Sequence, residues 1–104
     1  MVLNERRSRT AVILTDNQEA VRALKMGRQP GYDILGVVLV PGSISNEDLG
    51  KQVSRQNEGG AYEVVQAVLL FGGVDFVTQA QITMLNVLGI EVREIGYPQS
   101  ELQF

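Results

Sequence analysis

The chain has 104 residues, of which 44% are hydrophobic, and its formal net charge is −3 at pH 7. This length fits one domain, and the absence of cysteine and histidine excludes disulfides, zinc sites built on these residues and the commonest general base. The basic residues form no stripe interleaved with aromatic residues, so we expect no nucleic-acid binding.

The stretch from Thr10 to Gly42 predicts a strand, a helix and a second strand. The two strands are the apolar runs Ala11–Leu14 and Ile34–Val40, which are typical of strands buried on both faces in a parallel sheet. A helix over Asn17–Arg28 supplies the crossover that a parallel pair of strands requires.

Capping residues predict where the first two helices begin. We expect Asp16 to be the N-cap of the first helix, with Glu19 three residues later as in a capping box. Ser45 predicts the N-cap of a second helix. This second helix becomes polar beyond Val53 and ends at Gly59-Gly60, so we expect it to be a partly exposed cover for the sheet.

The second half of the chain continues the alternation of strands and helices. Val64 to Phe71 is a mostly apolar third strand that fits a central position in the sheet. Apolar residues at helical spacing from Val77 to Leu88 predict a third helix, with Gly89 as its left-handed C-cap. The residues from Ile90 to Ile95 alternate apolar with charged, which is typical of an edge strand with one wet face.

These elements predict an α/β fold, namely a three-layer, doubly wound, Rossmann-like domain with four parallel strands in the order 2-1-3-4. We place this domain at residues 10–96, between a basic N-terminal linker over 1–9 and a C-terminal linker over 97–104. The arginines of the N-terminal linker fit either a solvated terminus or a segment close to anionic lipid heads.

In such a sheet the ligand crevice lies beyond the carboxyl ends of the strands, where the winding reverses. The candidate ligand-binding residues are those of the two loops that meet there: Thr15, Asp16, Asn17, Gly72, Gly73 and Asp75. The backbone N–H groups of Gly72 and Gly73 could form an anion site ahead of a helix, or the turn could be purely structural and capped by Asp75. Asp16 and Asp75 could face each other as paired carboxylates, or each could cap a helix.

The loop after the first strand does not fit a dinucleotide. The G-x-G-x-x-G pattern keeps side chains away from the pyrophosphate, whereas this loop reads Thr-Asp-Asn-Gln-Glu-Ala from Thr15 to Ala20. The segment Val40 to Gly42 offers no acidic residue to hold a ribose. We therefore expect no NAD, no catalytic set and no metal site, and no cofactor other than a nucleotide or nucleotide-sugar at the glycine turn.

Five stretches carry a resemblance to one family: Arg6–Arg7, Glu19–Leu24, Pro30–Val38, Tyr62–Leu70 and Leu88–Arg93. Together they resemble the Rossmann-like, CoA-binding-like cytoplasmic domain of bacterial polyprenyl glycosylphosphotransferases. A similar domain precedes the catalytic part of capsular-polysaccharide sugar epimerases or dehydratases. The chain departs from the family pattern at the glycine-rich turn and at the acidic residue after the second strand.

The resemblance implies a module at the inner face of the cell membrane, between a membrane-spanning bundle and a transferase domain. The parent enzymes move a sugar phosphate from a nucleotide-sugar to undecaprenyl phosphate in exopolysaccharide or O-antigen synthesis. The catalytic residues of the transferase have no counterpart here, so we expect a non-catalytic regulatory or assembly domain. Its expected partners are the remainder of the transferase or a second copy of itself, with membrane contact only through the parent protein or the basic N-terminus. The alternative is a sensor domain that binds a nucleotide or nucleotide-sugar.

Overall fold

The computed structural model describes residues 9–25, 31–40, 42–56, 58–73 and 76–96. Within these ranges the helices are α1 (Gln18–Lys25), α2 (Asn46–Val53) and α3 (Gln79–Val87). The strands are β1 (Arg9–Thr15), β2 (Tyr32–Leu39), β3 (Ser54–Gln56), β4 (Tyr62–Val64), β5 (Ala67–Phe71) and β6 (Glu91–Gly96). The predicted linkers lie outside the described residues, except for Arg9, which is the first residue of β1. The predicted end of the first helix at Arg28 also lies outside the described residues.

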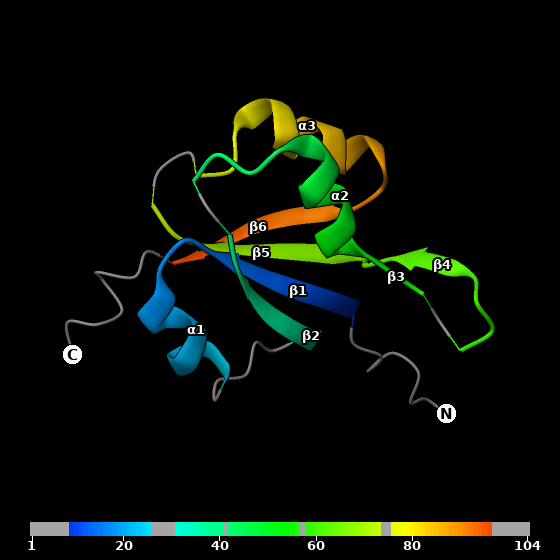
Figure 1. Ribbon diagram of the computed structural model, residues 1–104, viewed down its shortest axis with the longest axis horizontal. Coiled ribbons are helices and arrows are strands. Elements are labelled where there is room, and N and C mark those ends of the chain that lie inside the picture. Colours follow the sequence, from blue (N-terminus) through cyan, green and yellow to red (C-terminus); the bar gives the residue numbers. More distant parts are fainter. Residues whose placement is uncertain (1–8, 26–30, 41, 57, 74–75, 97–104) are drawn as a thin grey trace.

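The main sheet has four parallel strands in the order β2-β1-β5-β6 (Figure 1). The predicted α/β class and parallel sheet are therefore confirmed. The observed order equals 2-1-3-4 when only the strands of this sheet are counted. The arrangement follows because α1 crosses from β1 to β2, and the chain then returns to the other side of β1 to add β5.

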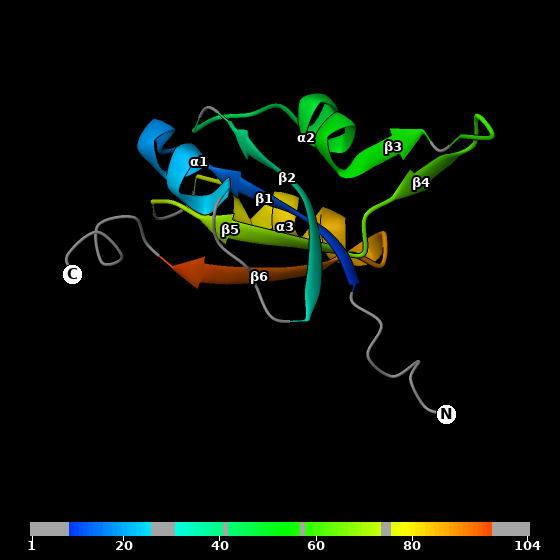
Figure 2. The same cartoon turned by 90° about the horizontal axis from the view of Figure 1, so that it is seen from below.

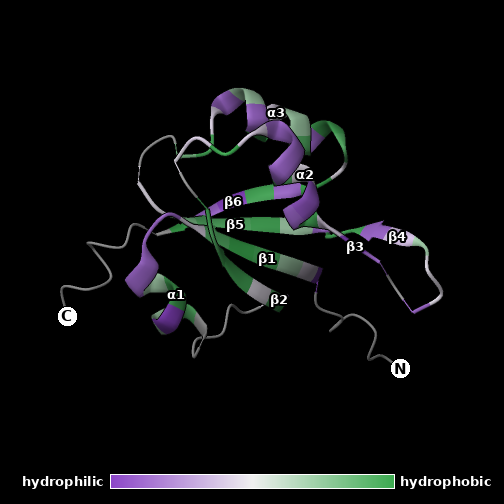
Figure 3. Cartoon of the chain, in the orientation of Figure 1, coloured by the Kyte–Doolittle hydropathy of each residue, from purple (hydrophilic) through white to green (hydrophobic). Residues whose placement is uncertain are grey.

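Helices lie on both faces of the main sheet. Figure 1 shows α1 on one face and α2 with α3 on the other. The face under α2 and α3 carries the larger cluster of buried apolar side chains, which includes Leu49 and Leu85, and the face under α1 carries a smaller one around Ile13. Figure 3 shows that β1, β2 and β5 are mainly hydrophobic. Burial of β1 and β5 between the helices drives the fold.

The two central strands differ from β2 in their burial. Every residue of β5 is buried, which confirms the predicted central position of the third strand. The prediction that the second strand is buried on both faces is wrong, because β2 is an edge strand and its residues are only half-buried or exposed. Leu35 is 38% exposed and Leu39 is 48% exposed.

The segment after α2 differs most from prediction. The second helix ends at Val53, and the following residues form an antiparallel hairpin of β3 and β4 instead of more helix. Gly60 has φ +88°, a conformation that suits the turn of this hairpin. The predicted third strand begins at Ala67 rather than at Val64, because Val64 still belongs to β4 of the hairpin. Figure 2 shows the hairpin projecting past the amino ends of β1 and β5.

Two amino-terminal caps were predicted, and one of them is correct. The Ser45 hydroxyl accepts a hydrogen bond from the Asp48 backbone N–H, which confirms Ser45 as the N-cap of α2. The prediction that Asp16 caps the first helix is wrong. Asn17 takes this place, since its Oδ1 accepts from the backbone N–H groups of Glu19 at 2.8 Å and Ala20 at 3.2 Å. The Asp16 carboxylate is thereby left to act elsewhere.

The helix α3 begins at a capping box rather than at Asp75, which lies outside the described residues. The Thr78 hydroxyl accepts from the Gln81 backbone N–H, and the Gln81 side chain accepts from the Thr78 backbone N–H, both at 3.1 Å. Gly89 follows the helix with φ +87°, so the predicted left-handed residue at its carboxyl end is confirmed.

Candidate functional site

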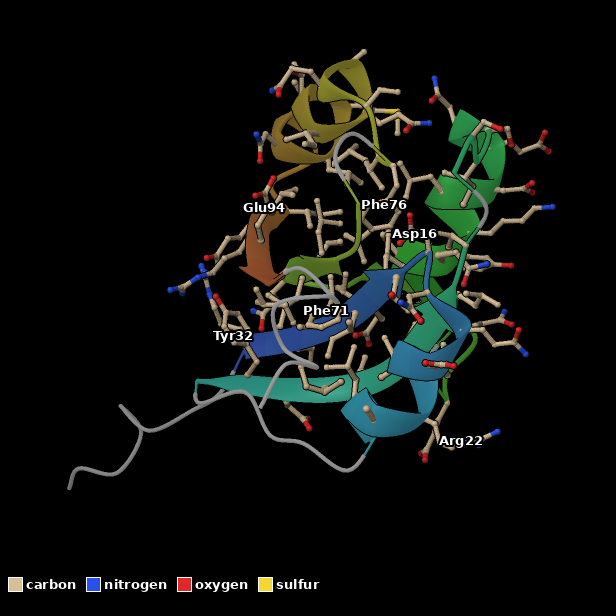
Figure 4. All side chains as sticks on the ribbon, turned by 90° about the vertical axis from the view of Figure 1, so that its left-hand side faces the viewer. Asp16, Arg22, Tyr32, Phe71, Phe76 and Glu94 are labelled. Atoms are coloured by element: carbon tan, nitrogen blue, oxygen red, sulfur yellow. The ribbon has the colours of Figure 1, made fainter. Side chains whose placement is uncertain are left out.

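The loops that follow β1 and β5 touch at the carboxyl end of the sheet. The pairing of Thr15 with Phe71 brings the two strand ends side by side. Beyond them, Asp16 Oδ1 accepts a hydrogen bond from the Gly73 backbone N–H at 3.3 Å. Figure 4 shows Asp16 close to Phe76, which comes after the glycine turn. The structure therefore joins three of the predicted site residues, Asp16, Gly72 and Gly73.

Two further predicted site residues serve local structure. Thr15 is fully buried, and its Oγ1 accepts from the Asn17 backbone N–H at 3.1 Å. Asn17 in turn caps α1 with its side-chain oxygen. The side-chain oxygens of both residues thus accept hydrogen bonds from the chain itself. The sixth candidate, Asp75, lies outside the described residues, so its pairing with Asp16 stays a prediction.

Gly72 lies where the side chains of Asp16 and Phe76 leave no room for a Cβ atom unless one of them shifts. A Cβ atom at Gly72 would lie 2.6 Å from Asp16 Oδ1 and 2.7 Å from Phe76 Cε1. Phe76 is 6% exposed and belongs to the larger apolar cluster, so its ring cannot move aside freely. The glycine turn is therefore packed tightly between the carboxylate and the aromatic ring.

Replacing Gly72 by alanine is expected to lower the free energy of unfolding by about 1–3 kcal/mol, because the new methyl group overpacks this contact. Urea unfolding of the purified variant measures the change. Gly73→Ala is the matched control, because its Cβ would lie 3.4 Å from the nearest atom, Asp16 Oδ2, and that exposed carboxylate can turn away. Equal stability of the two variants would contradict the packing described here.

A second polar cluster lies at the opposite, amino-terminal end of the strands. Glu91 forms an ion pair with Arg9 and accepts a hydrogen bond from the Tyr32 hydroxyl at 2.9 Å. Arg93 donates to the same hydroxyl at 3.5 Å, and this hydrogen bond, followed by the charge interactions with Tyr32 and Glu91, raises the pKa of the Arg93 guanidinium. The cluster links β1, β2 and β6 across the sheet. The charged and hydroxyl groups of the cluster pair with one another, so we assign it a structural role in joining the strands rather than a catalytic one.

An open groove lies between the edge strand β2 and the helix α2, with a volume of about 240 Å³. The residues that line it come from β1, β2, α2 and β3: Val12, Leu35, Gly36, Val38, Lys51, Gln52, Ser54 and Arg55. This groove is not among the sites predicted from the sequence. A usable signal was nevertheless present, because the predicted order 2-1-3-4 already leaves the second strand at an edge of the sheet.

Comparisons with protein-family models, with curated proteins and with solved structures find no match to this chain. Across the described ranges, no helix is both long and apolar enough to span a bilayer. The same part of the chain contains no group of three or more acidic residues placed to hold a metal ion. The functional proposal below therefore starts from the loops after β1 and β5 and from the groove beside β2.

Proposed function

We propose that this chain is a non-catalytic assembly domain of doubly wound, three-layer, Rossmann-like architecture. The observation that carries the proposal is the hydrogen bond from the Gly73 backbone N–H to the Asp16 carboxylate. In Rossmann-like domains the turns at this crevice hold the negative groups of a ligand with bare backbone N–H groups. Here a side-chain carboxylate of the chain already occupies that position, and it would repel an incoming phosphate.

We further propose that the domain belongs to a membrane-bound sugar-phosphate transferase of exopolysaccharide or O-antigen synthesis. This part of the proposal is supported by the resemblance of the stretches between Arg6 and Arg93. In this role the domain lies at the cytoplasmic face of the membrane as part of a larger protein, and it positions the transferase or pairs with a second copy. Size-exclusion chromatography with light scattering tests the pairing, and a strict monomer at high concentration would leave the remainder of the transferase as the partner.

A titration of thermal stability separates the assembly role from that of a nucleotide sensor. The melting temperature of the chain is expected to stay constant with UDP-sugars, coenzyme A or NAD at millimolar concentration. A ligand present at 100 times its Kd would instead raise the free energy of unfolding by roughly 2.7 kcal/mol. A saturable rise with any of these compounds would overturn the assembly proposal in favour of a sensor that binds at Gly72-Gly73.

The variant Asp16→Ala tests whether the Asp16 carboxylate is what prevents an anion from binding at the glycine turn. It removes the carboxylate from the Gly73 N–H and leaves the α1 cap on Asn17 intact. If the carboxylate alone prevents anion binding, this variant gains a thermal shift with UDP-sugar that the wild type lacks. A shift in the wild type that is unchanged in the variant would place binding away from the crevice.

A further inference from the structure

The outer edge of β2 has no neighbouring strand among the described residues. An edge strand presents a row of backbone N–H and C=O groups that can pair with an added strand. Natural sheets usually protect such an edge with lysine or proline, whereas the sequence of β2 is Tyr-Asp-Ile-Leu-Gly-Val-Val-Leu, with Asp33 as its single charged residue. The backbone N–H and C=O groups of the outer β2 edge can therefore form hydrogen bonds with another extended segment.

The groove beside this edge has an apolar floor. Val12 and Val38 are contributed by the sheet. Leu35 is the extra residue of a β-bulge, since Ala11 pairs with Ile34 and Val12 with Gly36, and the bulge lets Leu35 line the same groove. The volume of about 240 Å³ is below the roughly 300–1,000 Å³ of pockets that enclose small ligands. It suits one or two apolar side chains of a bound peptide instead.

The rim of the groove is cationic although the chain as a whole carries a net charge of −3. Lys51 and Arg55 line it and are exposed, and no carboxylate is among the lining residues. The ion pair between Arg9 and Glu91 involves neither cation, and Arg55 lies opposite Glu63 in the pairing of β3 with β4. An acidic side chain two positions from an apolar one along an extended peptide points to the same face, and it would therefore meet a complementary charge at the groove.

We propose that β2 and this groove bind an acidic, apolar peptide segment of another protein, which adds to the sheet as an extra strand. Main-chain hydrogen bonds along the β2 edge supply affinity, the floor holds an apolar side chain, and the cationic rim selects glutamate or aspartate. This inference rests on the proposed assembly role, for which it supplies a surface. The crevice at Gly72-Gly73 takes no part in it.

Gly36 provides a sharp test because it keeps the groove open. A Cβ atom at Gly36 would meet no atom within 4 Å, and valine favours strands, so Gly36→Val is expected to fold with unchanged or higher stability. The probe is a short fluorescent peptide in which every second residue is in turn valine or glutamate, with serine between them, so that valine and glutamate share the face that meets the groove. Fluorescence anisotropy is expected to show saturable binding to the wild type and at least about tenfold weaker binding to Gly36→Val, which corresponds to about 1.4 kcal/mol.

Charge variants test the cationic rim. The double variant Lys51→Glu and Arg55→Glu is expected to weaken binding of the acidic peptide by about tenfold or more, and it serves as the deciding variant if Gly36→Val fails to fold. Arg22→Glu on α1, which lies on the other face of the sheet, is the control and is expected to bind as the wild type does. A second peptide with lysine in place of each glutamate is expected to bind at least about tenfold more weakly than the acidic one.

Four outcomes would overturn the proposal: no binding of the acidic peptide, equal binding of both peptides, full binding by the charge variant, or a dimer in light scattering that Gly36→Val abolishes. The last result would assign the edge to a second copy of the chain. Nucleotide binding at the crevice would overturn the proposed function alone, since it would leave the effect of Gly36→Val on peptide binding unchanged. A failure of the peptide-binding proposal can therefore be distinguished from a failure of the proposed assembly function.

Discussion

Replacing Leu85 by alanine is expected to lower the free energy of unfolding by about 2–5 kcal/mol. Leu85 on α3 is fully buried in the larger apolar cluster, between the helix and the sheet. Its removal deletes buried methyl groups and leaves a cavity that the surrounding strands cannot close. Since domains of this size have a total stability of about 5–15 kcal/mol, the loss is a large fraction of the whole. Urea unfolding followed by circular dichroism measures it.

The same helix offers the matched control. Val87 is 80% exposed, so Val87→Ala removes methyl groups that already contact water and is expected to change stability by no more than about 0.5 kcal/mol. The melting temperature should fall by several degrees per kcal/mol for the Leu85 variant and stay near the wild-type value for the control. Similar values for the two variants would mean that α3 does not pack on the sheet through Leu85.

Replacing Gln81 by glutamate is expected to destabilise the fold at neutral pH, although glutamate is common at this position of a helix. Gln81 is 7% exposed, and its Nε2 donates to the Ile44 carbonyl at 2.8 Å and to Asn46 Oδ1 at 3.0 Å. A carboxylate has no hydrogen to donate. The Asn46 amide can turn round, but the Ile44 carbonyl cannot, so a buried charge would face a buried acceptor.

Two opposing free energies decide whether Gln81→Glu stabilises or destabilises the fold. An uncompensated buried charge costs about 3 kcal/mol, whereas a negative charge in the first turn of a helix gains at most about 1 kcal/mol in an exposed setting. The net loss is therefore about 2 kcal/mol at pH 7. Because burial disfavours the charged form, the pKa of the introduced carboxyl is raised in the folded state. The loss is absent below the unfolded pKa and grows as the pH rises through the folded pKa.

Gln79→Glu is the control for this substitution. Gln79 is exposed in the same first turn of α3, so the introduced charge is expected to be neutral or slightly stabilising. Urea unfolding of both variants at pH 4 and pH 7 is the measurement. A Gln81 variant whose stability does not depend on pH more than that of the control would contradict the buried hydrogen bonds that join α3 to α2.

Much of the main sheet could be predicted from local patterns. The apolar runs around Ile13 and Leu69 are too uniformly hydrophobic for a strand with a wet face, and an intervening helix is the shortest route between parallel strands. The alternating residues before Ile95 predicted an edge strand, and β6 is one. Ser45 and Gly89 were correctly placed because caps and left-handed residues depend on the local backbone alone.

The errors arose where a local preference had two solutions of similar energy. Asp16 and Asn17 are both good N-caps, and the contact of Asp16 with Gly73, far along the chain, selected Asn17 for α1. The polar segment after Val53 could continue a helix or turn back, and the residues around Gly60 formed a hairpin. Neither the choice of cap for α1 nor the choice between helix and hairpin after Val53 can be predicted from the hydrophobic periodicity of a few residues.

Local hydrophobicity was enough to predict the class of the fold and the parallel sheet, because both follow from uniformly apolar runs that alternate with helical segments. The hydrogen bond between the Asp16 carboxylate and Gly73 and the open groove beside β2, with Lys51 and Arg55 at its rim, exist only in the folded chain. These features join residues that are tens of positions apart. Their geometry is fixed by the packing of the helices on the sheet, which no local pattern encodes.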